Sequence, residues 1–198
     1  MRSLLREAIE ALAIAVFLTF LFQSVGQVYQ VHGWSMEPTL LHADRVVLNK
    51  AAYLRIDAEP TARLLPWLEA EPGAAWEPFG GPKRGDVVVF AYPNDPSQAF
   101  VKRVIGEPGD SVRFEDGVIY LNGVPLEEGY VEYGSHETLA EITVGEGEYF
   151  VVGDNRPESS DSRAWGTVSR EAIIGKTWVT YWPPERFGTL TYPIVPPW

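Results

Sequence analysis

Residues 86–105 read DVVVFAYPNDPSQAFVKRVI, two apolar runs separated by a segment rich in proline, asparagine and aspartate. Both runs are rich in Val, Ile, Phe or Tyr, which are enriched in β-strands. The Pro, Asn and Asp residues between them are typical of turns. The stretch therefore predicts two strands, residues 86–92 and 99–105, rather than a helix.

Similar runs recur along most of the chain. They are bounded by Gly, Pro, Asn or Asp, and they comprise residues 27–31, 45–48, 117–121, 148–152 and 177–182. Asn122-Gly123 favours a type I′ hairpin turn. One short helix is expected over residues 169–176, with Ser169 as N-cap and Gly175 past its end. We predict a mainly β fold, an antiparallel β-barrel or sandwich-like domain over residues 29–198.

Residues 51–82 differ in composition from the rest of this domain. They are rich in Ala, Pro and Glu, and their prolines exclude a long helix or a central strand. We expect an irregular surface insertion there, with a helical turn or two near residues 61–70. Residues 111–152, by contrast, leave room for only a hairpin or two.

Residues 1–28 contain the most apolar part of the chain. Between Ala11 and Phe22 only Thr19 is polar. As a helix, residues 8–28 would be about 31 Å long, close to the thickness of a bilayer core. We therefore predict a single transmembrane anchor. A cleaved signal peptide and a buried helix of a soluble protein are the alternatives, although no convincing small-x-small cleavage site follows the run.

The charges around this run predict its orientation. Arg2 and Arg6 precede it, and no basic residue follows until Arg45. By the positive-inside rule the N-terminus then lies in the cytoplasm and residues 29–198 lie outside the cytoplasmic (inner) membrane.

Composition excludes several classes of function. The formal net charge of −11 argues against a nucleic-acid groove or a polybasic lipid-binding surface. The chain has no cysteine, which excludes a disulfide framework, a zinc-thiolate site and a cysteine nucleophile.

Ser35 lies in GWSMEPTL, residues 33–40, soon after the apolar run. It is either a loop serine or a nucleophile, and a nucleophile needs a group that takes its proton. None of the three histidines (His32, His42 and His136) stands in a recognisable triad context, although spacing alone does not exclude one. A lysine is the other candidate, if burial makes it neutral.

Lys102 is the strongest lysine candidate. In AFVKRVIG it would share one face of a strand with Phe100 and Val104, whereas Arg103 would point the other way and be solvated or paired. The alternative is an exposed lysine on an edge strand.

A polar segment, GDNRPESSDSRAWG at residues 153–166, follows the apolar run at residues 148–152. Its Asp, Asn, Arg and Ser side chains can bond to backbone or to one another, as in a loop that holds an active site. A solvated cluster of turns is the alternative.

Together these motifs resemble the type I signal peptidases, membrane-bound serine proteases with a Ser-Lys dyad. The resemblance covers an anchor followed in order by GWSMEPTL, RGDVVVF (84–90), KRVIGEPGD (102–110) and GDNRPESSDSRAWG. It implies that Ser35 attacks the scissile carbonyl of a preprotein and that Lys102 is the general base. It also implies that Ser159 orients the lysine, and that no metal or cofactor is required.

The resemblance also assigns supporting and oxyanion residues. Asp161 and Arg163, with Asp154 and Arg156, would buttress the polar loop. The Ser35 N–H would be one oxyanion donor. Part of the family has a second donor, a serine hydroxyl, at the position of Gly33; here a backbone N–H or a water is left as the alternative.

Family substrates carry small residues at the first and third positions before the cut, the Ala-x-Ala pattern, which apolar walls of a shallow pocket select. The matching positions are Tyr29, Val31, Met36, Leu40, Val89, Phe100 and Val101. Ordinary core packing is the alternative for each of them.

The implied partners are exported preproteins and the lipid bilayer, with the translocation machinery as an open further partner. Trp34 and the aromatic residues near the C-terminus suggest a surface that dips into the membrane; core packing is an equal alternative for Trp178 and Trp182. Two other functions stay open: a self-cleaving Ser-Lys protease and a membrane-tethered β-domain that binds peptides without cutting.

Overall fold

The computed structural model describes residues 6–7, 9–12, 14–16, 26–57 and 75–190 of the chain. Within these ranges every pair of neighbouring strands is antiparallel. The predicted mainly β, antiparallel class is therefore confirmed.

The larger sheet contains eight strands and carries the site. Its order is β1 (Gly26–Gln30), β2 (Arg45–Asn49), β13 (Ile173–Trp182), β5 (Val87–Tyr92), β6 (Asp95–Gly106), β11 (Glu148–Val152) and β12 (Val168–Ser169), and β14 (Gly188–Thr189) pairs with β13. The two runs first quoted become β5 and β6, with Val88 opposite Lys102. Since β6 lies between β5 and β11, Lys102 is not on an edge strand.

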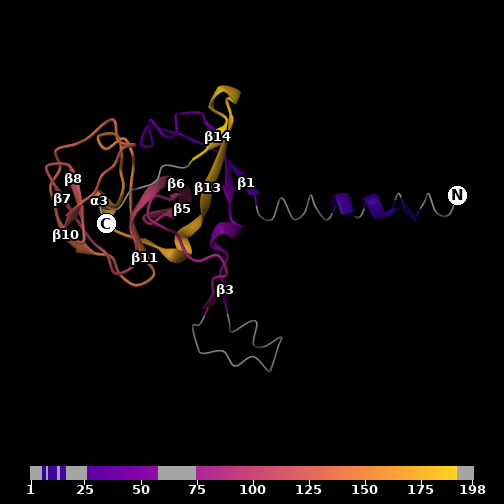
Figure 1. Cartoon of the computed structure of the whole chain (residues 1–198), viewed down its shortest axis with the longest axis horizontal. Coiled ribbons are helices and arrows are strands. Elements are labelled where there is room, and N and C mark those ends of the chain that lie inside the picture. The colour runs from indigo at the N-terminus through magenta and orange to yellow at the C-terminus, as the bar shows by residue number, and fades with distance from the viewer. Residues whose placement is uncertain (1–5, 8, 13, 17–25, 58–74, 191–198) are drawn as a thin grey trace.

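The smaller sheet lies within residues 111–152. Its order is β10 (Leu139–Thr143), β7 (Ser111–Glu115), β8 (Val118–Leu121) and β9 (Val124–Pro125). Asn122 and Gly123 join β8 to β9 with φ of 51° and 82°, as a type I′ turn requires. In Figure 1 this sheet lies at the opposite end of the β body from β1 and β13.

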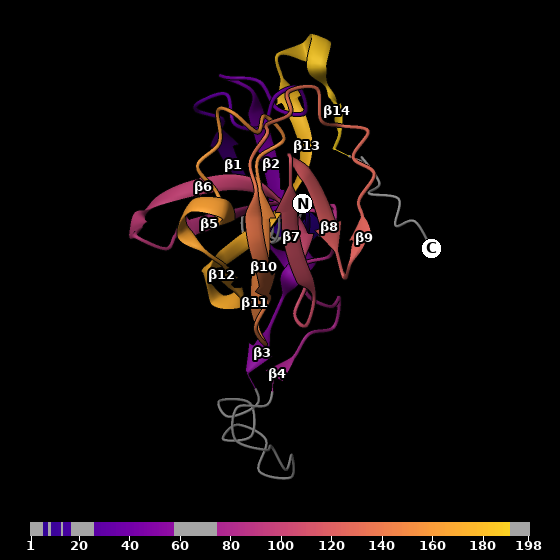
Figure 2. The ribbon, with the colours of Figure 1, turned by 90° about the vertical axis from the view of Figure 1, so that its left-hand side faces the viewer.

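Buried side chains join the two sheets. Phe114 on β7 and Ile119 on β8 pack in one cluster with Ile105 of β6 and Phe150 of β11. Figure 2 shows β7 and β10 beside β11. The small sheet thus stabilises the strands that hold the lysine and the polar loop, because it covers their apolar side chains.

The predicted helix over residues 169–176 is wrong. Only Arg170–Ala172 form a 3₁₀ turn, η2, and the Ser169 side chain makes no capping hydrogen bond. Strand β13 begins at Ile173, which pairs with Phe90 of β5. Strand pairing of the β-branched residues in this segment overrides the capping signal.

Two predictions fall partly on residues outside the described ranges. The described part of the insertion contains η1 (Ala51–Tyr53), β3 (Ile56–Asp57) and β4 (Ala75–Trp76), of which the two strands pair. The predicted helical turn near residues 61–70 lies outside the described residues.

The predicted span, residues 8–28, also falls largely outside, and the residues described there up to position 16 are helical. Among the described segments, no helix has the length and apolar character needed to cross a bilayer. Residues 26–28 belong to β1, which shortens the predicted helix at its C-terminal end because they pair with β2.

Candidate active site

Ser35 and Lys102 meet at the centre of the site. Lys102 Nζ lies 2.8 Å from Ser35 Oγ and donates to the Val101 carbonyl oxygen at 3.0 Å. Within the part of the chain that the structure describes, Lys102 is the only side chain that bonds to Ser35 Oγ. The proton of this serine therefore has a lysine, and not a histidine, within reach.

Burial changes the acidity of Lys102. Its relative exposure is 4%, and its amine lies 5.5 Å from the centre of the Phe100 ring. Loss of solvent lowers the pKa of Lys102 to about 8, although the charges of Asp161 and Asp154 act in the opposite direction. A large fraction of this amine is therefore neutral in mildly alkaline water and can accept a proton.

The backbone around Ser35 is fixed by the segment that follows β11. The Asn155 N–H donates to the Ser35 carbonyl oxygen at 3.1 Å. Gly153 makes this approach feasible, since a Cβ there would lie 2.4 Å from the same oxygen and 2.2 Å from Ser159 Oγ. Any side chain at residue 153 would displace the nucleophile or the serine behind it.

Asp161 organises the polar loop. It accepts hydrogen bonds from the Gly153 N–H at 3.0 Å, from Ser159 Oγ at 2.6 Å and from Arg163 Nε at 2.8 Å. It is also the N-cap of the short helix α3 (Ser162–Trp165). The Ser159 hydroxyl thus donates to Asp161 and not to Lys102, because a carboxylate is the stronger acceptor. That Ser159 orients the lysine stays a prediction.

A buried ion pair lies beneath the nucleophile loop. Arg103 donates to Asp154 through Nε at 2.8 Å and Nη2 at 2.7 Å, and Thr39 Oγ1 donates to the same carboxylate at 2.5 Å. Arg103 is therefore paired, one of the two expected states, and not solvated. Thr39 was not singled out from the sequence, since its partner lies far along the chain.

Arg156 connects the loop to the small sheet. It donates through Nε to the Gly153 carbonyl oxygen at 3.1 Å and through Nη2 to Glu128 at 2.6 Å. Glu128, which follows β9, was not predicted as a site residue because it lies in no recognisable sequence motif. Arg163 Nη2 donates to the Arg156 carbonyl oxygen at 2.8 Å, so three of the four predicted supporting residues, Arg156, Asp161 and Arg163, are connected by hydrogen bonds. The fourth, Asp154, bonds instead to Arg103 and Thr39.

The two predicted oxyanion donors differ in availability. Within the described ranges, the Ser35 N–H makes no hydrogen bond. The Gly33 N–H instead donates to His42 Nδ1 at 3.1 Å. While that bond holds, the Gly33 N–H is not available as the second donor.

An open cleft of about 420 Å³ contains Ser35 and Lys102. Five of the predicted substrate-binding residues line it: Tyr29, Val31, Val89, Phe100 and Val101. The sequence reasoning missed other lining residues, which are Gln30, His32, Val46, Gln98, Ala99, Glu158 and Ser160. Ala99 alternates with Val101 on the predicted strand and could have been identified in this way, but Gln98 lies outside that predicted strand and nothing local marks Val46.

Met36 and Leu40, the other two predicted substrate-binding residues, are buried. The Leu40 N–H donates to the Met36 carbonyl oxygen at 2.8 Å, so the chain turns after the serine. Both side chains pack with Val31, Val46 and Val87, and the first two of these valines line the cleft. Contact of Met36 and Leu40 with substrate stays a prediction.

The arrangement can perform acyl transfer. A serine hydroxyl beside a desolvated amine is an activated nucleophile, and the Ser35 N–H is free to stabilise an oxyanion. The apolar cleft walls would favour a peptide with small side chains next to the serine.

Comparison with known proteins gives a consistent result. Residues 4–182 match the family described as signal peptidase, peptidase S26. The chain is 37% identical to the probable signal peptidase I-2 of Synechocystis sp., over 79% of this chain and 63% of that one. It is 32% identical to the probable signal peptidase I-1 of the same organism, over 94% and 87%, and 31% identical to signal peptidase IB of Staphylococcus aureus, over 94% of each chain.

The family match and two of these three relatives extend over nearly the whole chain, and the family match covers the segments with the serine, lysine and polar-loop motifs. They agree with the resemblance seen in the sequence. The chain belongs to the signal peptidase family, peptidase S26.

Proposed function

We propose that this chain is a membrane-anchored signal peptidase I that removes N-terminal signal peptides from exported preproteins after Ala-x-Ala-like sites. Ser35 is the nucleophile and Lys102 the general base. The observation that carries this proposal is the 2.8 Å contact between a buried Lys102 Nζ and Ser35 Oγ. A self-cleaving protease or a non-cleaving peptide binder lacks such support, since the matched relatives are signal peptidases.

The mechanism follows from this contact. Neutral Lys102 takes the hydroxyl proton while Ser35 Oγ attacks the scissile carbonyl, and the Ser35 N–H stabilises the oxyanion. Lys102 then gives the proton to the leaving amine, which leaves an acyl-enzyme on Ser35. A water that loses its proton to Lys102 releases the signal peptide.

Cleavage of a model preprotein by the full chain in detergent tests this function. We expect one cut after Ala-x-Ala, mapped by mass spectrometry, and loss of that cut when leucine replaces the last alanine. The expectation rests on the apolar walls to which Val31 and Val89 contribute, since such walls favour a small side chain beside Ser35. Equal cleavage of the leucine substrate would contradict the small-residue specificity.

The pH dependence of kcat/KM is a prediction of the lysine base. Burial lowers the pKa of Lys102 to about 8, and only the neutral amine accepts a proton. We expect kcat/KM to rise with pH by up to about tenfold per unit below pH 8 and to level off above it. A profile that is flat between pH 6 and 9 would contradict a lysine base.

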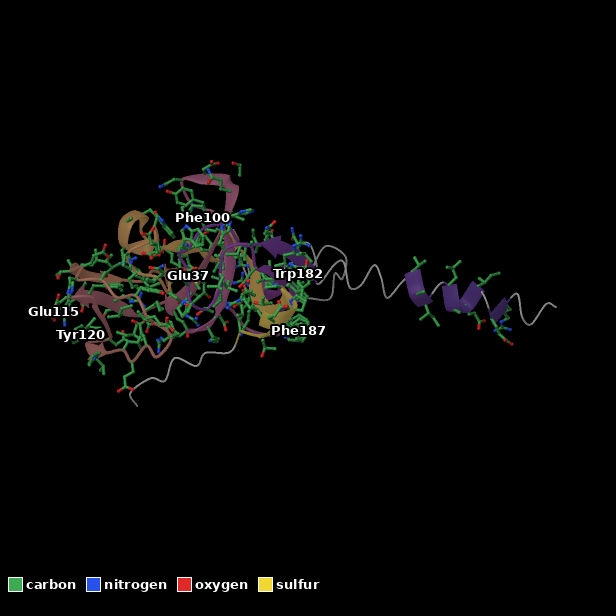
Figure 3. The ribbon with its side chains drawn as sticks, turned by 90° about the horizontal axis from the view of Figure 1, so that it is seen from above. Glu37, Phe100, Glu115, Tyr120, Trp182 and Phe187 are labelled. Carbon is green, nitrogen blue, oxygen red and sulfur yellow. The ribbon has the colours of Figure 1, made fainter. Side chains whose placement is uncertain are left out.

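The anchor and its orientation are further parts of the proposal. The apolar segment that begins at residue 8 and precedes β1 would span the inner membrane with the N-terminus in the cytoplasm, and the β domain would act outside. In Figure 3, Trp182 and Phe187 lie at the opposite end of the β body from Glu115 and Tyr120. Trp34, Trp178 and Trp182 are each about half exposed, which suits a surface that contacts lipid head groups.

Lipid contact of Trp34 is testable in the full chain reconstituted in vesicles with brominated acyl chains. Because bromine quenches only nearby indoles, we expect Trp34→Phe to reduce the quenched fraction of tryptophan fluorescence. Trp165→Phe is the matched control, since that ring packs against Phe90 and Tyr92. If the quenched fraction stayed the same in Trp34→Phe, Trp34 would not contact the lipid.

A further inference from the structure

His42 lies on a tight turn that faces the residues before the nucleophile. The Val31 N–H donates to the Asp44 carbonyl oxygen at 2.8 Å, and the Ala43 N–H donates to the Val31 carbonyl oxygen at 2.9 Å. The Asp44 carboxylate accepts from the Leu41 N–H at 2.9 Å and from Arg186 Nε at 3.0 Å. The turn that carries His42 is therefore held at both ends.

The imidazole of His42 contacts both residues that precede Ser35. Its Nδ1 accepts the Gly33 N–H at 3.1 Å. Its ring lies 4.8 Å from the Trp34 ring, centroid to centroid, at an interplanar angle of 35°. Gly33 has a φ of 91°, a conformation that other residues rarely adopt and that needs a fixed partner to be held in one orientation.

We propose that His42 is a positioning residue for the nucleophile. By holding Gly33 and Trp34, it fixes the direction in which the next residue presents its N–H and hydroxyl to the cleft. His42 does not touch the reacting atoms; it acts through the backbone of residues 33–35. This inference rests on the proposed role of Ser35 as nucleophile.

The contact depends on the protonation state of the ring. Neutral His42 accepts at Nδ1 and carries its proton on Nε2, whereas protonated His42 would place a second donor opposite the Gly33 N–H. The His32 ring lies 6.0 Å from the His42 ring, centroid to centroid, and the Asp44 carboxylate in the same turn is paired with Arg186.

Two substitutions separate the hydrogen bond from ring packing. In the full chain in detergent, His42→Phe keeps the ring on Trp34 and loses the acceptor, and we expect kcat to fall by about tenfold, roughly the value of one hydrogen bond, with KM little changed. His42→Asn supplies an oxygen acceptor near the position of Nδ1 and should restore most of kcat.

The split between kcat and KM and the rescue by asparagine together give a readout that a merely structural role would not change. Loss of packing alone would affect His42→Asn at least as much as His42→Phe, because asparagine lacks the ring that lies on Trp34. We therefore expect His42→Asn to exceed His42→Phe in kcat while KM stays close to the wild-type value in both variants.

The controls distinguish the two proposals. His136→Phe, on an exposed histidine that contacts Asp116, should match the wild type in kcat and KM. If Ser35→Ala kept its activity, the proposed function itself would fail. If Ser35→Ala were inactive but His42→Phe matched the wild type in kcat, the positioning role of His42 would be overturned.

Discussion

Lys102→Met is expected to reduce kcat for preprotein cleavage by at least about 10⁴-fold, the cost typical of removing one member of a catalytic unit. Methionine fills nearly the same buried volume but has no amine, so no group within the described structure could accept the proton of Ser35. The measurement is single-turnover cleavage of a model preprotein by the full chain.

Ser35→Ala should be equally inactive, and the double variant should lose little more, because the two residues act as one unit. Lys83→Met is the matched control, since that lysine is exposed and pairs with Glu107; it should cleave like the wild type. More than about a tenth of wild-type activity in Lys102→Met would exclude a lysine base, since a lost general base costs at least about 100-fold.

Asp154→Asn is expected to lower the free energy of unfolding by about 3–5 kcal/mol, because it removes the carboxylate that forms the buried ion pair with Arg103. Arg103 and Asp154 are both 1% exposed in their side chains, and the carboxylate also accepts from Thr39. Urea unfolding of the full chain in detergent measures the effect.

Glu115→Gln provides the comparison for Asp154→Asn. Glu115 pairs with Arg113 at the surface, where such a pair is worth roughly 0–1 kcal/mol. A loss below about 1 kcal/mol in Asp154→Asn would mean that Arg103 is compensated by other groups and that the pair is not the main support of the loop.

The longer strands of the large sheet could be predicted, at least in part, because they contain apolar runs bounded by turn residues. The two-residue strands β12 and β14 were not predicted, because so short a segment carries no pattern. Strand β7 was missed because SVRFE at residues 111–115 alternates polar and apolar residues in only five positions. The helix over residues 169–176 failed because strand pairing of Ile173 decides that segment, and a capping signal carries no information about a distant strand.

The site residues likewise divide into those that a local sequence motif identifies and those whose placement depends on contacts formed by folding. Ser35 and Lys102 could be identified because each lies in an ordered motif, and the structure places them in contact. The burial of Met36 and Leu40 could not be inferred, since it follows from the way the chain turns after Ser35. The contact of His42 with Gly33 could not be inferred from the sequence either, because it depends on how the turn brings these two residues together.

The close approach of Gly153 to Ser35 has a consequence for biosynthesis. Ser35 leaves the ribosome early, but the segment that holds its carbonyl oxygen, Gly153–Asn155, is made only after most of the domain. A nascent chain therefore carries the serine before the segment that supports its backbone exists. We expect proteolytic competence to arise only when synthesis of the domain is nearly complete.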